Sequence, residues 1–301
     1  MQGGLPYIAA IAARTGTLLM SHARIALLTL LALFAFAGNS LLCRAALAHT
    51  GIDAATFTLV RLLSGAVVLA LLAWWRKGGA SGRGNWLSAL ALFAYAAAFS
   101  FAYVKLTAAA GALLLFGAVQ ATMIAHGLWS GERLRPLQLG GLVLAAGGLV
   151  GLVLPGLSAP PLAAALLMLA AGIAWGMYSL RGRGAGDPLQ VTAGNFLRAV
   201  PLAAVLALLM FRHITPDPTG LGYAVLSGAL ASGMGYAIWY SALPFLTSVT
   251  AATVQLAVPV IAALGGVFLL GEPLTLRLLA ASVAILGGVA LVVMTGAKRT
   301  Q

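Results

Sequence analysis

The feature that most constrains the fold of this chain is a series of long apolar runs that recur from one end to the other. About 20 apolar residues are enough for a helix to cross a bilayer. Apolar residues make up 62% of the chain and charged residues only 7%, whereas soluble domains carry about a quarter charged residues. The runs are apolar on every side, unlike the alternating strands of a membrane barrel. The sequence therefore predicts an all-α integral membrane protein.

Ten runs are long enough to be transmembrane helices, and segments rich in glycine, proline and charge separate them. The predicted helices cover residues 25–48, 55–75, 86–104, 107–130, 137–154, 162–181, 190–210, 220–242, 247–270 and 275–295. Residues 1–23 form an N-terminal leader or tail without a convincing cleavage site. Residues 1–19 of this segment are interpreted as a dispensable leader or a choice of start site.

The chain contains an internal repeat with an offset of 140 residues. With this offset Gly131-Glu132 aligns with Gly271-Glu272, and Gly147-Gly148 aligns with Gly287-Gly288. We interpret the chain as two five-helix repeats, residues 24–156 and 157–296. A cytoplasmic tail, residues 297–301, follows them. Because five is odd, the second repeat is inverted relative to the first. Secondary transporters built in this way bind substrate near the midplane, between the repeats.

The net charge of +12 does not indicate a nucleic-acid partner, because the basic residues lie in short clusters between apolar runs. With the N-terminus inside, eleven basic residues fall on the inner side: Arg14, Arg24, Arg76, Lys77, Arg83, Arg133, Arg135, Arg181, Arg183, Lys298 and Arg299. The other six fall on the outer side or near span ends: Arg44, Lys105, Arg212, Arg277, Arg61 and Arg198. This bias predicts that both termini are cytoplasmic.

Two glutamates stand out because the chain has only five acidic residues. Glu132 and Glu272 each follow a glycine at the end of one predicted span and precede the next span. A carboxylate there accepts hydrogen bonds from the first N–H groups of the following helix and interacts favourably with its dipole. We therefore predict that Glu132 and Glu272, like Pro259 in the ninth span, have structural roles.

Polar side chains inside the predicted spans are candidate substrate contacts, because burial of polar atoms in a membrane is costly. Asn39 in the first span is predicted either to bind substrate or to hydrogen-bond a neighbouring helix. Gln120 and Gln255 lie at comparable depth in the fourth and ninth spans, which favours a shared cavity. His126 lies near the inner end of the fourth span, where it is either a proton or substrate contact or a water-facing side chain.

Aromatic residues supply the remaining candidates for the substrate site. Tyr95, Phe99 and Tyr103 follow one another at four-residue intervals and share one face of the third span. The eighth span carries Tyr236, Trp239 and Tyr240, and the sixth carries Trp175 and Tyr178. Either they pack the bundle or they line a cavity, where tyrosine offers a stacking face and a hydroxyl to a flat, partly polar solute.

Several functions are disfavoured by residues that the sequence lacks. All five acidic residues, Asp53, Glu132, Asp187, Asp217 and Glu272, lie at span ends or in loops. A proton-coupled exporter of lipophilic cations would use a carboxylate within the membrane, so uncoupled or exchange transport of neutral or zwitterionic solutes is favoured. The single Cys43 and the absence of a GxxxxGK[ST] motif leave no expected disulfide, Cys-based metal site or bound ATP, and no cofactor is predicted.

The segment VPVIAALGGVFLLGEPLTLRLLAASVAILGGVALVV, residues 258–293, has a proline in the ninth span, Gly-Glu at its end and paired glycines in the tenth. With Ala174-Trp175-Gly176 in the sixth span, it resembles the drug/metabolite transporter superfamily, in particular ten-span EamA-type exporters of aromatic amino acids and metabolites. The resemblance covers roughly residues 24–296. Val119-Gln120 stands where that family has a proline in the fourth span, so this helix is expected to be straighter than the ninth.

The resemblance implies a secondary transporter of the bacterial inner membrane that exports aromatic or neutral amino acids, or similar small metabolites, by alternating access. Its expected partners are a small-molecule substrate and the lipid bilayer; the oligomeric state is left open, and a monomer is consistent with the sequence. A broader drug/metabolite or nucleotide-sugar carrier is the alternative. A membrane-embedded lipid-modifying enzyme is disfavoured because the histidines are scattered and no acid pair exists, so no enzymatic activity is predicted.

Overall fold

The computed structural model describes residues 21–76, 84–131, 135–154, 156, 159–182, 186–246, 251 and 254–296. Over these ranges the regular structure is helical, without strands. The interpretations given above for Glu132, for residues 1–19 and for the tail at 297–301 lie outside the described residues.

The first five predicted spans form five helices whose bounds agree with the predicted ones to within one helical turn. They are α2 (His22–His49), α3 (Ala54–Trp75), α4 (Trp86–Tyr103), α5 (Ala108–Trp129) and α6 (Pro136–Val153). Side chains fix several of the starting points, because they accept hydrogen bonds from the otherwise unpaired N–H groups of the first turn. Asp53 does so for α3, Asn85 for α4 and Thr107 for α5.

The second half forms α7 (Leu162–Gly182), α8 (Pro188–Leu209), a helix in three parts, and α12 (Ala257–Leu270) and α13 (Leu276–Gly296). The three-part helix consists of α9 (Pro218–Leu226), the π-helical η2 (Ser227–Met234) and α10 (Gly235–Ala242). Two short 3₁₀ turns, η1 (Phe211–His213) and η3 (Leu243–Phe245), follow α8 and α10. Within the described ranges, nine helical segments are long and apolar enough to cross a membrane, and α12 is a shorter apolar helix.

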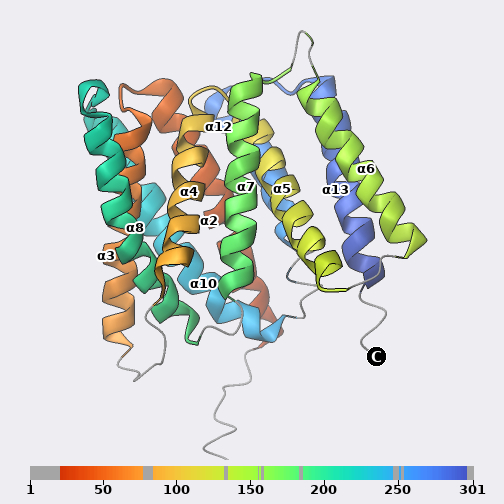
Figure 1. Cartoon of the computed structure of the whole chain (residues 1–301), viewed down its shortest axis with the longest axis horizontal. Helices are drawn as coiled ribbons and strands as arrows, with labels where there is room; N and C mark the ends of the chain where they lie inside the picture. Colours follow the sequence, from red (N-terminus) through yellow and green to blue (C-terminus); the bar gives the residue numbers. More distant parts are fainter. Residues whose placement is uncertain are drawn as a thin grey trace, which may run out of the picture.

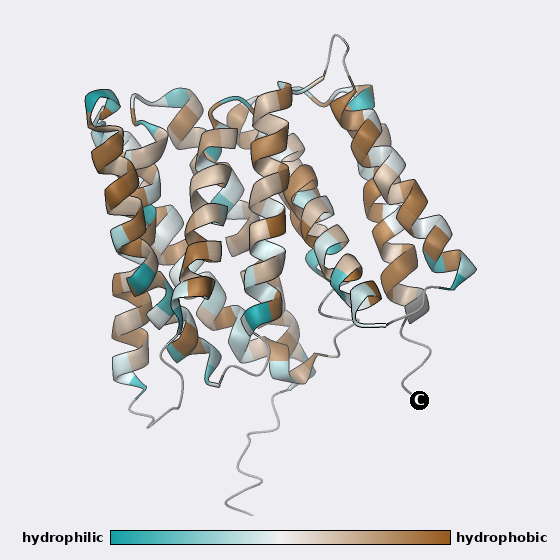
Figure 2. Ribbon diagram, viewed as in Figure 1, coloured by the Kyte–Doolittle hydropathy of each residue, from teal (hydrophilic) through white to brown (hydrophobic). Residues whose placement is uncertain are grey.

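The helices run side by side between two ends of the bundle, which we call the upper and lower ends as drawn in Figure 1. The α2 helix starts at the lower end and α7 starts at the upper end, so the two sets of five helices run in opposite directions. Many large hydrophobic side chains are exposed along the helices, and hydrophilic residues gather toward the helix ends (Figure 2). This distribution matches a bundle surrounded by lipid, because lipid offers no partner for polar groups.

The fourth and ninth spans differ as expected from Pro259. The α5 helix continues unbroken for 22 residues, whereas α12 begins only at Ala257 and has 14 residues. A proline has no N–H and clashes with the carbonyl four residues earlier, so it fits best in the first turn of a helix, although α8 accommodates Pro201 in its interior. Pro259 lies in the first turn of α12, directly after the turn at Leu256. The turn at Leu256 separates Gln255, which is itself helical, from α12.

Paired glycines hold α6 and α13 together as a separate pair of helices (Figure 1). A Cβ atom on Gly288 would overlap the carbonyl oxygen of Gly141, and one on Gly148 would lie 2.7 Å from the Cβ of Ala284. Such close approach of two backbones is possible only with small residues. The two glycines are equivalent in the repeat, since Gly148 aligns with Gly288 at the offset of 140 residues.

This packing gives a prediction with an internal control. Gly288→Leu is expected to lower the melting temperature of the purified protein, because overpacking against a neighbouring backbone costs about 1–3 kcal/mol or more. Gly287→Leu is the matched control, because a Cβ on Gly287 meets no atom within 4 Å. Equal melting temperatures for the two variants would contradict the assigned contact.

Candidate functional site

A cavity of about 580 Å³ lies between the two sets of helices. Its lining comes from α2, α4 and α5 of the first half and from α7, α8, η2 and α10 of the second. Toward the lower end the cavity reaches Gly182, Gly186 and Pro188 around the loop that follows α7. Ten of the residues singled out in the sequence line it: Asn39, Tyr95, Phe99, Gln120, Trp175, Tyr178, Tyr236, Trp239, Tyr240 and Gln255.

Trp175 lies at the centre of an aromatic cluster that joins both halves. Its ring is stacked on Tyr236, with 5.3 Å between the ring centroids and 20° between the planes. It also contacts Tyr95 of α4 at 4.8 Å and Tyr178 one turn later on α7 at 5.3 Å. Offset and tilted rings at these separations attract one another beyond the area they bury. The cavity wall is therefore a connected aromatic surface.

Phe36 extends this surface and was not among the sequence candidates. It lines the cavity from α2, with its ring 5.8 Å from Tyr236 and 5.9 Å from Trp239. The sequence signal was present but weak, because Phe36 lies in the LFAFAG stretch, where apolar residues surround it on every side. Only the packing of α2 against α10 brings it to the site.

A chain of buried hydrogen bonds runs along the upper part of the cavity. The Ser227 hydroxyl at the start of η2 donates to Asn39 Oδ1 at 2.6 Å, and Asn39 Nδ2 donates to the Tyr95 hydroxyl at 3.2 Å. The Arg61 Nη2 group donates to the same hydroxyl at 3.0 Å. The interhelical hydrogen bonds predicted for Asn39 are present, since it links α2 to two neighbouring helices; its side chain also lines the cavity, and its contact with substrate stays a prediction.

Gln120 and Gln255 lie in the lining of the same cavity, one from each half. Gln120 is a buried residue of α5, and Gln255 is half-buried just before the turn at Leu256 that precedes α12. Broken helices at the midplane are a recurring way for transporters to offer polar groups to a substrate. The break before α12 therefore gives Gln255 a physical reason to face the cavity.

Two of the twelve candidates do not line the cavity. Tyr103 is buried above it, where its ring packs edge-on against Phe99 at 4.7 Å and its hydroxyl donates to the Ala108 carbonyl oxygen at 3.3 Å. His126 is exposed on the lower turns of α5. The helix face shared by Tyr95, Phe99 and Tyr103 extends past the end of the cavity, so only the first two line it. In α5 the cavity lining ends before His126.

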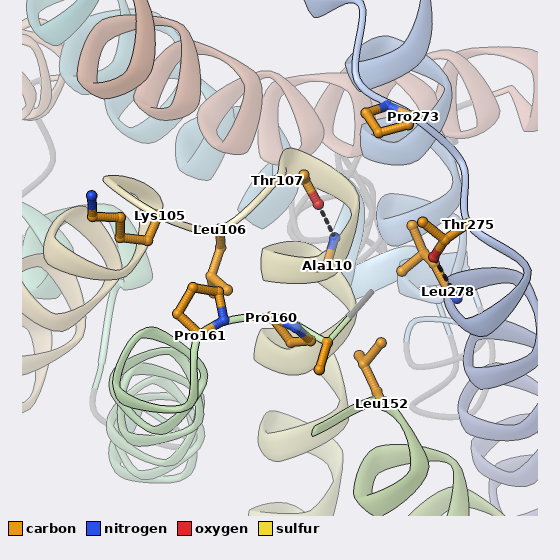
Figure 3. Close-up of a pocket in the computed structure, with 11 residues that line it drawn as sticks. Lys105, Leu106, Thr107, Ala110, Leu152, Pro160, Pro161, Pro273, Thr275 and Leu278 are labelled. Carbon is orange, nitrogen blue, oxygen red and sulfur yellow. Dashed lines mark hydrogen bonds between the residues drawn. The ribbon is translucent and has the colours of Figure 1, made fainter. Parts of the chain in front are cut away.

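The predicted capping role of Glu272 is correct in kind but wrong in partner. Its Oε2 accepts a hydrogen bond from the backbone N–H of Ala108, the first residue of α5, at 2.7 Å, and its Oε1 accepts from Arg44 Nε at 2.8 Å. The following helix, α13, is capped by Thr275, whose hydroxyl accepts from Leu278 N at 3.2 Å. Figure 3 shows this cap beside the equivalent cap of α5 by Thr107.

Glu272 reaches the other repeat because the chain reverses direction at Gly271. Gly271 has a φ of +64°, which closes α12 with a left-handed residue. The glutamate then lies beside Gly266 and the start of α5 instead of pointing along α13. Figure 3 also shows a smaller pocket of about 240 Å³ at this upper end, lined by residues such as Lys105, Pro161 and Pro273.

Arg61 is the largest difference between the expected and the observed placement of a side chain. Its charge was assigned to the outer side near a span end, but it lies within α3 with only 2% of its surface exposed. Asn195 was not among the candidates, yet it is buried in α8 and lines the cavity. Both are strongly polar residues more than one turn inside a span, and this depth was the available signal.

Comparisons with known proteins agree with this architecture. The model of the EamA-like transporter family matches twice, at residues 23–154 and 162–294, which correspond to the two sets of five helices. An uncharacterized protein of Pseudomonas aeruginosa is 61% identical over 274 residues, which cover 91% of this chain and 96% of that protein.

More distant similarities concern named exporters and a solved structure. The threonine/homoserine exporter RhtA of Salmonella typhimurium is 38% identical over 149 residues, and that of Escherichia coli K12 is 36% identical. These matches span about half of each exporter, 49% of its length. One solved protein structure has a TM-score of 0.65 over 93% of this chain at 20% identity, which supports the fold alone. The repeated family match over both sets of helices shows that this chain belongs to the EamA-like transporter family.

Proposed function

We propose that this protein is a secondary transporter that exports amino acids, aromatic or neutral, or similarly small metabolites by alternating access. The observation that carries the proposal is the cavity of about 580 Å³ between the two inverted halves. Its lining extends to the lower end of the bundle, while the Arg44–Glu272 ion pair ties helices together at the upper end. Alternating access requires such a site, reached from one side at a time.

The lining supports a small, partly polar substrate. The cavity volume falls within the range of about 300–1,000 Å³ that is common for sites of small molecules. Aromatic rings cover much of the wall, and the amides of Asn39, Gln120, Gln255 and Asn195 supply neutral hydrogen-bonding groups. The similarity to exporters of threonine and homoserine supports an amino-acid substrate, although it covers only half of those proteins.

Export also sets the orientation that we propose. The bias of basic residues supports a cytoplasmic location for both termini, and therefore for the lower end of the bundle. In this orientation the cavity loads from the cytoplasm, which is the side from which an exporter takes its substrate. The bacterial relatives support a location in the inner membrane.

We infer that transport is uncoupled or proceeds by exchange. Among the described lining residues there is no Asp, Glu or His. A proton-coupled carrier needs a group that binds and releases a proton beside the substrate. His126, the earlier candidate, is exposed outside the cavity.

The test is transport into proteoliposomes of purified full-length protein. Labelled threonine, homoserine, phenylalanine and tryptophan are each measured with and without an imposed pH gradient, and protein-free vesicles give the background. We expect saturable flux of at least one amino acid that exchanges with unlabelled substrate and is unchanged by the gradient. Flux that follows the gradient would contradict uncoupled transport, and absence of all amino-acid flux would favour the broader metabolite or drug carrier.

A further inference from the structure

Arg61 is a buried cation for which the described part of the chain supplies no counter-charge. Within that part, the ion pairs join Arg44 to Glu272 and Arg76 to Asp187. Arg61 Nη2 donates to the Tyr95 hydroxyl, but its Nη1 has no hydrogen-bond partner among the described residues. A guanidinium stays protonated in proteins, so the charge is permanent. Burial of a charge is costly unless something pairs with it.

The unpaired charge lies directly behind the wall of the cavity. The guanidinium carbon of Arg61 is 4.8 Å from the ring centroid of Phe99 and 5.3 Å from that of Tyr95, and both rings line the cavity. These contacts stabilise a cation only in part, because a ring offers a quadrupole instead of a full negative charge. A full negative charge at the upper end of the cavity would complete the compensation.

The Tyr95 hydroxyl connects the arginine to the cavity. It accepts hydrogen bonds from Arg61 Nη2 and Asn39 Nδ2, so its own hydrogen remains to be donated. Two donors on a phenolic oxygen polarise the O–H group and strengthen the bond that it donates. Tyr95 and Asn39 both line the cavity, and no acidic residue is found among the described lining residues.

We propose that Arg61 makes the upper end of the cavity a carboxylate site, with the substrate's carboxylate bound at Tyr95 and Asn39. This inference rests on the proposed transport function and specifies the chemical class of its substrate as a small carboxylate, such as an amino acid. An amino acid bound in this way directs its ammonium group away from Arg61, toward the ring faces of Trp175 and Tyr236, where a cation is attracted.

The experiment compares two probes that differ only at the carboxyl group. L-threonine and L-threonine amide are titrated by calorimetry into purified full-length protein, and 2-oxobutyrate serves as a carboxylate without an ammonium group. Wild-type protein is expected to bind threonine at least about tenfold more tightly than the amide, as a charge-assisted hydrogen bond in a buried site predicts. Equal or tighter binding of the amide would overturn the proposal.

Variants separate the charge of Arg61 from its packing. In Arg61→Met, which keeps the apolar stem, the ratio of amide to threonine Kd is expected to fall to about one, with Arg61→Lys intermediate. Arg24→Met is the matched control, since Arg24 is exposed at the start of α2 and should leave the ratio unchanged. If Arg61 had only a structural role, Arg61→Met would lower the melting temperature and weaken the binding of threonine and its amide equally. A ratio of the two Kd values that stays at the wild-type level in folded Arg61→Met therefore overturns the proposal.

Two further results keep the inference distinct from the transport function. If Arg61→Met does not fold, Tyr95→Phe takes its place, and an unchanged ratio in that variant overturns the carboxylate site. If wild-type protein binds 2-oxobutyrate but not threonine, and Arg61→Met abolishes that binding, the carboxylate site stands and amino-acid export fails. If vesicles transport uncharged solutes while neither carboxylate binds, transport stands and the carboxylate site is overturned.

Discussion

Glu272→Gln is expected to open the upper end of the bundle and to shift the protein toward the state in which the cavity faces that side. In the structure Glu272 ties three elements together, because it accepts from Arg44 of α2 and from the first N–H of α5 while belonging to the end of α12. Arg44 in turn donates through Nη1 to the carbonyl oxygens of Tyr103 at 3.0 Å and Val104 at 3.3 Å.

The magnitude follows from burial of the pair. The side chains of Arg44 and Glu272 are 17% and 9% exposed, so solvent screens them only in part. Loss of one partner of a fully buried pair costs about 3–5 kcal/mol, whereas exposed pairs contribute about 0–1 kcal/mol. We expect about 1–3 kcal/mol here, acting only on the state in which the upper end is closed. Since about 1.4 kcal/mol changes a population tenfold, the state that is open at the upper end should become about 5- to 150-fold more populated.

The only cysteine in the sequence is a built-in reporter for this change. Cys43 precedes Arg44 on α2 and is completely buried. A membrane-impermeant maleimide is expected to label Cys43 at least about fivefold faster in Glu272→Gln than in wild-type protein. Arg76→Gln is the control, because it removes the exposed ion pair with Asp187 and should leave labelling unchanged. If Cys43 is labelled at the same rate in Glu272→Gln as in wild-type protein, the Arg44–Glu272 ion pair does not control the opening of the upper end.

Trp175→Ala is expected to reduce transport about tenfold or more while the protein remains folded. The indole contacts Tyr95, Tyr178 and Tyr236, and its removal breaks the connected aromatic wall. Each aromatic contact contributes about 0.5–1.5 kcal/mol, so a substrate that stacks on this wall loses both a direct partner and the support of its neighbours. Trp175→Phe should retain part of the rate, because it keeps a ring in the stack.

The measurement is the initial rate of transport in proteoliposomes, with the melting temperature recorded for each variant. Trp74→Ala is the matched control, since Trp74 is 74% exposed on α3 and belongs to the outer surface. Its rate should remain near the wild-type value. If Trp175→Ala transports as well as Trp74→Ala, the aromatic cluster packs the bundle and takes no part in substrate binding.

Much of the architecture could be predicted from the sequence because lipid makes the rule for each span simple. A helix in a membrane must be long and apolar, and polar or turn-forming residues must lie between helices. The bounds of helices such as α3 and α7 therefore follow closely from the apolar runs. The ninth span was predicted over residues 247–270, whereas α12 begins only at Ala257, so that Pro259 lies in its first turn.

The composition of the cavity could be predicted only as a set of candidates. Polar and aromatic residues inside spans are unusual, so Asn39, Gln120 and Trp175 could be identified as unusual from their positions alone. Whether such a residue lines the cavity depends on the rotation of its helix and on where the cavity ends. Tyr103 shares a helix face with Tyr95 but lies above the cavity, and His126 is exposed.

The sequence by itself determined that this chain forms a membrane bundle of two inverted repeats. Hydrophobic length and turn residues are properties of each segment, and the repeat follows from aligning the chain with itself. The tertiary structure alone decided which distant groups meet. Glu272 contacts Arg44 across 228 residues and the start of α5 across 164, and Arg61 reaches Tyr95 on another helix. In a medium without water, buried charges must be compensated by whatever packing brings near them, and that packing is fixed only when the helices assemble.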